Sequence, residues 1–229
     1  MGKENENQKI NEYQSRNVFA RGICFYKIVW VFFVSALLGD FIETLYCWAL
    51  EGSLMSRSSV LYGPFSVVWG IGAIVLTIVL SKFEKKPKYY IFLVGAVIGG
   101  VYEYICSLFT EVFLGSVFWD YSWMPLNIGG RTNLLYMVFW GGLSVVWVKL
   151  IYPKMSALIE KIPDLQGRVI TWILIVFMIC NTLISAMAMV RYVKRQDGIE
   201  ARNAVEVFLD LNYEDEIIEK VWPNMVITR

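Results

Sequence analysis

Five long apolar segments constrain this chain of 229 residues more than any other feature of its sequence. A helix that crosses a bilayer needs about 20 mostly apolar residues, because it must span roughly 30 Å of hydrocarbon. Charged residues make up only 18% of the chain, whereas soluble domains carry about 25%. The sequence therefore predicts an all-α fold, a polytopic transmembrane helical bundle of about five spans. The predicted spans are 26–50, 62–80, 89–113, 134–152 and 169–192.

Basic residues in the short connections predict how the spans are oriented, because lysine and arginine favour the cytoplasmic side. They are concentrated before the first span and after the second and fourth, whereas the other two connections hold only Arg57 and Arg131. We therefore expect a multi-pass protein of a cell membrane. Its predicted parts are a polar cytoplasmic N-terminal tail (1–25), a transmembrane domain (26–192) and an acidic helical C-terminal tail outside (193–229).

The C-terminal tail contains two apolar sets at helical spacing. The first includes Val205, Phe208 and Leu209, and the second includes Ile217 and Trp222. Such spacing predicts a small helical cap that rests on the membrane domain or on the lipid surface. A helix that binds a partner protein is the alternative.

Several classes of function are disfavoured by what the sequence lacks. A net charge of +1 gives no basic field for nucleic acid. The chain has no histidine, which is the commonest metal ligand and general base. Its four cysteines form no Cys-x-x-Cys pair. We expect no cofactor, although Mg²⁺ or another cation held by carboxylates stays open.

A shift of 60 residues superposes the first span and loop on the third. The shift places Glu43 on Glu103 and Glu51 on Glu111, and Ala36 and Gly39 also fall on identical residues. With one extra residue in the second loop, Pro64 meets Pro125. Carboxylates are rare inside membranes, so their matching carries more weight than matched leucines. The pattern predicts a parallel internal repeat, with spans one and two equivalent to spans three and four.

Polar residues gather in the outer half of the predicted bundle. An aspartate at the centre of a membrane helix costs about 2.5–3.5 kcal/mol on insertion scales, so such residues usually face a protein interior or a wet cavity. A structural alternative remains, in which arginines pair with carboxylates and hold the helices together. The candidate substrate-binding residues are Asp40, Glu43, Glu51, Arg57, Glu103, Glu111, Asp120, Asn127 and Arg131.

Four of these features together resemble one family. They are the Gly39-x-x-x-Glu43-x-x-Tyr46 run, the Tyr62-Gly63-Pro64 turn, the Glu103 helix and the WDYS…PLNIGGR segment at 119–131. This combination is similar to the CmpB-type family, whose members are named as type IV ABC-transporter permeases. The tail segments MVRYVKRQ (189–196) and VWPNM (221–225) also look similar to that family. The resemblance implies a multi-span membrane protein, usually bacterial.

Three functions remain open. The first is a permease-like subunit whose outward-facing polar cavity binds a solute, an ion or a lipid headgroup. The chain has no G-x-x-x-x-G-K-[ST] phosphate loop, so an ATP-driven version needs a separate ATPase subunit.

The second function is that of an intramembrane enzyme acting on a lipid-linked substrate, which ranks lower because no nucleophile–base pair is visible. The third is an accessory or sensory protein that uses its outer tail. Membrane lipids are expected partners, and a homo-oligomer is left open.

Overall fold

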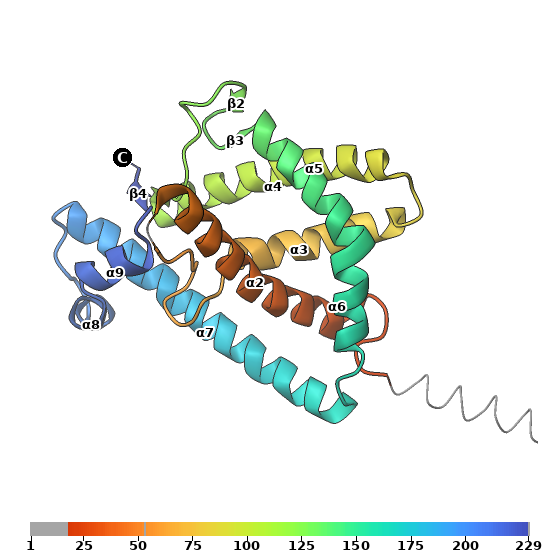
Figure 1. Cartoon of the computed structure of the whole chain (residues 1–229). Coiled ribbons are helices and arrows are strands. Elements are labelled where there is room, and N and C mark those ends of the chain that lie inside the picture. Colours follow the sequence, from red (N-terminus) through yellow and green to blue (C-terminus); the bar gives the residue numbers. More distant parts are fainter. Residues whose placement is uncertain (1–17, 53, 229) are drawn as a thin grey trace, which may run out of the picture.

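The computed structural model describes residues 18–52 and 54–228, which form a bundle of long helices with a small helical cap at one end (Figure 1). Four helical stretches are long and apolar enough to cross a membrane, and a shorter apolar helix covers Val67–Phe83. This confirms the predicted all-α, polytopic bundle. The first 17 residues of the predicted N-terminal tail lie outside the described part. The four long stretches are Phe25–Ala49, Lys88–Leu114, Leu134–Ile159 and Asp164–Gln196.

Helices account for most of the described chain, and four short strands form two small ladders. The helices are α2 (Phe25–Glu51), α3 (Val67–Leu80), α4 (Lys88–Leu114), α5 (Leu134–Val146), α6 (Tyr152–Ile159), α7 (Asp164–Gln196), α8 (Ala204–Asn212) and α9 (Asp215–Val221). The antiparallel strand pairs are β1 (Ser116–Val117) with β4 (Val226–Ile227) and β2 (Asn127–Ile128) with β3 (Thr132–Asn133).

Local sequence explains where several helices begin and end. Helices α2 and α4 stop at Gly52 and Gly115, whose φ angles of 71° and 69° lie in the left-handed region that glycine adopts without strain. Pro87 stands immediately before α4. The Asn133 side chain accepts a hydrogen bond from the Tyr136 N–H and so caps the first turn of α5.

The second apolar helix is shorter than predicted, because it begins at Val67 rather than near residue 62. The residues before it form an irregular segment, 58–66, that packs against α7. Asn181 donates to the Tyr62 carbonyl (2.7 Å) and accepts from the Tyr62 N–H (3.2 Å), and Ser185 accepts from the Leu61 N–H. Asn181 lies about 18 Å along the apolar stretch of α7 that starts at Val169. Irregular backbone is tolerated at such depth only where protein groups satisfy it or it lines a cavity.

The fourth predicted span, 134–152, runs further than predicted, because its helical stretch ends at Ile159. A π-helical stretch, Trp147–Ile151, joins α5 to α6, and Pro153 lies in the first turn of α6. Proline has no N–H to donate and crowds the preceding turn, so a wider turn keeps the helix continuous across it.

Two helix hairpins, α2–α3 and α4–α5, pack through the same kinds of contact. A Cβ placed on Gly39 would lie 2.3 Å from the Trp69 side chain, and one placed on Gly99 would lie 2.2 Å from that of Trp140. In each hairpin a second glycine meets a phenylalanine. These pairs are Gly70 with Phe32 and Gly141 with Phe92. Small residues at these positions let the two helices of each hairpin approach closely.

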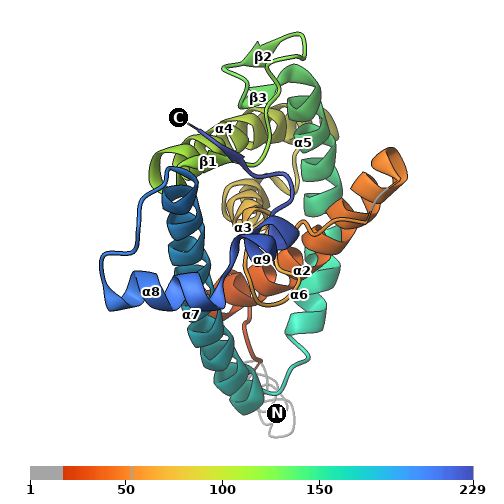
Figure 2. The ribbon, with the colours of Figure 1, turned by 90° about the vertical axis from the view of Figure 1, so that its left-hand side faces the viewer.

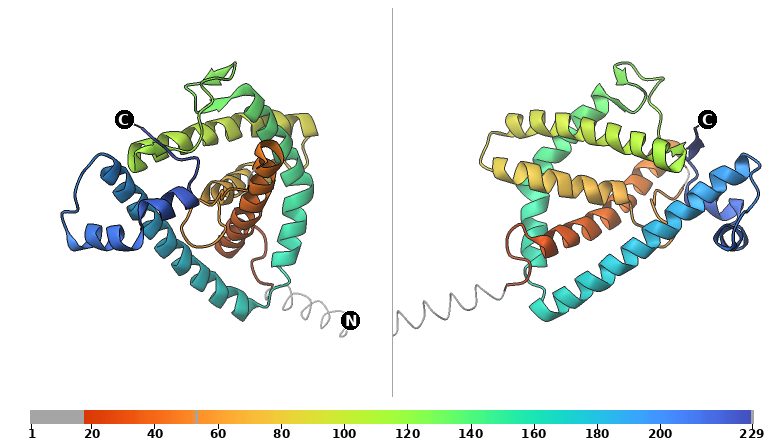
Figure 3. Two further views of the ribbon diagram at one scale, coloured as in Figure 1. Left: turned by 60° about the vertical axis from the view of Figure 1, so that its left-hand side comes forward. Right: turned by 180° about the vertical axis from the view of Figure 1, so that it is seen from behind.

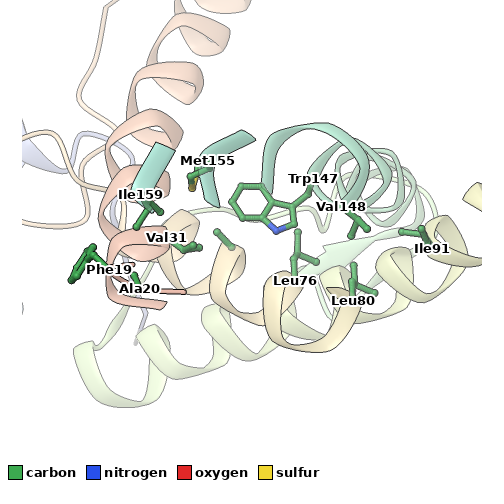
Figure 4. Close-up of a cluster of buried hydrophobic side chains, with 11 residues drawn as sticks. Phe19, Ala20, Val31, Leu76, Leu80, Ile91, Trp147, Val148, Met155 and Ile159 are labelled. Atoms are coloured by element: carbon green, nitrogen blue, oxygen red, sulfur yellow. The ribbon is translucent and has the colours of Figure 1, made fainter. Parts of the chain in front are cut away.

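The main hydrophobic core joins α2, α3 and the α5–α6 stretch near the N-terminal end of α2 (Figure 4). Trp147 fills its centre and donates its indole N–H to Thr77 on α3 (3.1 Å). Beside this core, the fully buried Lys27 donates to the Ser156 carbonyl (3.0 Å) and pairs with Glu160 (2.8 Å). The ammonium group thereby ties the start of α2 to α6.

The C-terminal cap lies at the opposite end of the bundle from the start of α2, as Figure 1 and the right-hand view of Figure 3 show. Leu209, Ile218 and Trp222 pack there against the last turns of α7. Strand β4 then runs back to pair with β1 at the end of α4. The segments that follow α2 and α4 and the cap therefore share one end of the molecule. That this end faces outward, with the N-terminus inside, stays a prediction.

Candidate functional site

Glu43 of α2 is held by two donors from its own hairpin. Arg57 donates to Oε1 of Glu43 through Nε (2.9 Å) and Nη2 (2.6 Å). The Trp69 indole N–H of α3 donates to Oε2 (2.7 Å). Both carboxylate oxygens therefore have partners, and the ion pair fixes the start of the loop after α2.

Asp40 and Glu51 lie on the same helix, at either side of Glu43. The Asp40 side chain is buried, and its Oδ1 atom accepts no hydrogen bond within the described part of the chain. Glu51 is the last residue of α2, and its side chain is outside the described structure. Asp40 therefore contributes a buried carboxyl group one helical turn from Glu43.

Glu103 of α4 is also buried, but its partners are uncharged. The Tyr121 hydroxyl donates to Oε1 (2.9 Å), and the Thr132 hydroxyl donates to Oε2 (2.7 Å). Tyr121 stacks on Tyr136 of α5, with ring centroids 4.6 Å apart. Burial raises the pKa of Tyr121, and the nearby carboxylates of Glu103 and Glu43 raise it further. Tyr121 thus connects Glu103 of α4 to Tyr136 of α5, within the electrostatic field of both deep carboxylates.

Arg131 forms an ion pair with Glu111 near the end of α4. A second N–H group of its guanidinium donates to the Ser107 hydroxyl (3.3 Å), and the guanidinium lies 5.8 Å from the centre of the Tyr104 ring. Its backbone carbonyl accepts from the Trp119 indole (2.9 Å). Arg131 is therefore fixed from both its side chain and its backbone.

Asp120 and Asn127 shape the loop between α4 and α5. Oδ1 of Asp120 accepts from the Ser122 N–H (2.8 Å) and hydroxyl (2.6 Å), and these bonds hold the pKa of Asp120 below its usual value. The Asn127 side chain donates to the Met124 carbonyl and accepts from the Gly130 N–H (3.0 Å). Gly130 has a φ of +70°, and a Cβ there would lie 2.6 Å from the Asp120 carboxylate. Glycine is thus required where the loop folds back on Asp120.

A pocket of about 140 Å³ opens at the end of α4, under this loop. Of the nine predicted residues, it brings together Glu111, Asp120 and Arg131. Asp40, Glu43, Arg57, Glu103 and Asn127 do not line it. Thr228, which follows strand β4, forms part of its wall. The lining residues are Ser107, Glu111, Val117, Trp119, Asp120, Gly129, Gly130, Arg131 and Thr228.

Reasoning from the sequence missed the residues that hold these side chains. Trp69, Tyr121 and Thr132 bind the deep carboxylates, and Ser107 and Trp119 position Arg131. The aromatic composition of 119–131 was the available signal for Trp119 and Tyr121. Within the described residues, no group of three or more Cys, Asp or Glu side chains is placed to hold a metal ion.

Membrane-crossing helices and a polar pocket at the end of one of them define a multi-span integral membrane protein. A family described as "Putative ABC-transporter type IV" matches residues 30–186, more than half of the chain. The chain therefore belongs to this family, which confirms the resemblance to the CmpB-type proteins. The match ends within α7, so the similarity of the tail segments stays a prediction. No curated protein and no solved structure matches the chain.

Proposed function

We propose that this chain is the membrane subunit of an ATP-driven transporter, and that the pocket between Glu111 and Arg131 binds a small charged group of a solute, an ion or a lipid headgroup. The observation that carries the proposal is the pocket itself. Its wall combines a fixed arginine, two carboxylates and the backbone of Gly129 and Gly130. The family description supplies the transporter class.

The size and charge of the pocket narrow what it can hold. A volume of about 140 Å³ equals roughly four to five water molecules at about 30 Å³ each. It therefore suits one charged group and not a whole large solute. Glu111 and Asp120 give two negative charges against one positive charge on Arg131, so the balance favours a ligand group that carries positive charge.

We also propose that the two hairpins arose by duplication. The glycines and phenylalanines of the matching contacts are each 60 residues apart, Gly39 with Gly99 and Phe32 with Phe92. Their partners are 71 residues apart, Trp69 with Trp140 and Gly70 with Gly141. An insertion of 11 residues in the second loop accounts for the difference. The inserted loop is the one that forms the pocket, which supports a functional role for it.

The proposed source of energy is a separate ATPase subunit, because no G-x-x-x-x-G-K-[ST] phosphate-binding loop occurs among the 229 residues. The experiment is affinity purification of the tagged chain from native membranes, with ATP hydrolysis and mass spectrometry as readouts. An unrelated multi-span protein with the same tag is the control. We expect an ATPase subunit with a phosphate-binding loop to co-purify with this chain alone. If neither an ATPase subunit nor ATP hydrolysis above the control is found, the transporter proposal is wrong.

A further inference from the structure

Helix α8 turns its charged face toward the protein and its apolar face outward, which is the reverse of a helix on the surface of a soluble protein. Glu206 and Asp210 point toward α7, where they form ion pairs. Its other face is apolar and turned away from the bundle. The exposed fractions there are 55% for Val205, 50% for Phe208 and 73% for Leu211. In a water-soluble protein the apolar side would face inward.

The inward face of α8 neutralises the basic end of α7. Arg191 is buried, and it donates to both oxygens of Asp210 at 2.8 Å. Arg195 also pairs with Asp210 (2.7 Å), and Lys194 pairs with Glu206 (2.8 Å). Bidentate pairing of this kind is the strong form of the arginine–carboxylate contact. The acidic residues of α8 are therefore bound within the protein.

The position of α8 along α7 corresponds to the edge of the hydrocarbon layer. Residues 169–190 of α7 carry no charged side chain, and 22 helical residues span about 33 Å, close to the roughly 30 Å of a bilayer core. Arg191 is the first charged residue after them, and α8 packs at its level. Figure 2 shows α8 lying across α7 and not along it, as a helix in the plane of the membrane would lie.

We propose that α8 is an interfacial helix whose apolar face, formed by Val205, Phe208 and Leu211, is inserted among the lipids. Lipid is the occupant that fits, because α8 packs on the membrane-crossing helix α7, whose Leu183 and Met187 are also exposed. An exposed apolar face of this kind needs such a cover. The tail is then a part of the membrane domain that anchors the end of α7. This inference does not depend on the pocket or on an ATPase.

The test uses the full-length wild-type protein in phosphatidylcholine–phosphatidylglycerol vesicles. One sample is photolabelled with a lipid-dissolved diazirine and a second with a water-soluble diazirine, and labelled residues are identified by peptide mass spectrometry. The internal control is Glu216, an exposed polar residue of α9. We expect Phe208 and Leu211 to take several-fold more lipid-borne label than Glu216. The water-soluble reagent should give the reverse order.

A series of protein-to-lipid ratios separates lipid from a second copy of the chain as the cover. Lipid-borne labelling of Phe208 that stays constant on dilution supports the proposal. Labelling that appears only on dilution shows that a second copy covers the face, and it overturns the proposal. Equal labelling of Phe208 and Glu216 by the water-soluble diazirine also overturns the proposal, because the apolar face of α8 is then in contact with solvent.

Discussion

The hairpins α2–α3 and α4–α5 have the same glycine–tryptophan packing, but their arginine–glutamate ion pairs lie at different positions along the first helix. In the first, Arg57 lies on the deep carboxylate Glu43. In the second, the deep carboxylate Glu103 has hydroxyl partners, and Arg131 lies on Glu111, two turns nearer the end of the helix. One scaffold thus carries its arginine at two different depths.

The loops of the two hairpins also differ in their surroundings. The first loop turns into the protein, and the side chains of Asn181 and Ser185 on α7 satisfy its backbone. The second loop stands at the end of the bundle as the β2–β3 ladder and forms the wall of the pocket. Under the proposed function, the first hairpin serves mainly as a fixed support, and the second presents charged groups to the ligand.

The largest predicted effect tests the shared scaffold. Valine at Gly39 or at Gly99 would overlap a tryptophan side chain at its Cβ and Cγ atoms, so we expect each variant to lose about 3 kcal/mol of unfolding free energy. Thermal unfolding in detergent measures the change. Gly142→Val is the matched control, because nothing lies within 4 Å of a Cβ at that position. If all three variants unfold at the same temperature, close packing at Gly39 and Gly99 is not what stabilises the two hairpins.

The next effect should separate the loops. Asn181→Leu leaves the N–H and carbonyl groups of Tyr62 without their partners inside the protein, and we expect a loss of about 2 kcal/mol. Hydrogen exchange should rise in residues 58–66 and stay unchanged in residues 119–131. Asn127→Leu, which removes side-chain bonds in the second loop, should give the reverse pattern. Equal exchange in both loops for either variant would contradict the proposed separation.

A smaller effect concerns the two ion pairs. Arg57→Gln removes the charged partner of Glu43, and we expect a loss of about 1.5 kcal/mol, most of which the double variant Arg57→Gln/Glu43→Gln should recover. Arg131→Gln should destabilise the fold less, because its pair lies nearer solvent. Denaturant titration of the three variants measures both differences. If Arg131→Gln lowers the unfolding free energy more than Arg57→Gln does, the proposed difference between the two ion pairs is wrong.

The smallest effect is a pH dependence of the turn at Asp120 in the second loop. Hydrogen bonds from Ser122 lower the pKa of Asp120 in the folded state. The ionised carboxylate therefore stabilises this turn fully at pH values above 3.8, the ordinary pKa of the group. That support is lost as pH falls through the lowered folded pKa. In the first loop, Arg57 forms an ion pair with Glu43 of α2, which Asp120→Asn leaves intact. Limited proteolysis of the Asp120→Asn variant at neutral pH should therefore cut 119–131 faster than in the wild type and leave 54–66 unchanged; equal cutting of the variant and the wild type would contradict the prediction.

The sequence predicted the membrane-crossing helices well, because long apolar runs have few alternative explanations. It misplaced the start of the second helix because Val60, Leu61, Tyr62 and Phe65 are as apolar as a span. What holds those residues in a loop is hydrogen bonding to α7, more than a hundred positions away.

The candidate site was predictable only in part, for a similar reason. Glu43 and Glu103 are conspicuous because carboxylates are rare in membrane helices. Their partners Trp69, Tyr121 and Thr132 belong to residue types that are common throughout the chain, so only the folded hairpins single them out. The split of the charged residues into separate groups likewise depends on which way each loop turns.

The most direct test of the pocket is native mass spectrometry of the protein extracted with its bound small molecules and lipids. The account predicts a bound species in the wild type and in Arg57→Gln. That species should be lost in Glu111→Gln, which removes one of the two carboxylates that favour a positively charged group, and in Thr228→Trp, which fills the pocket without removing a charge. A wild type with no bound species, or a species retained equally by all three variants, would contradict the assignment of the second loop as the ligand site.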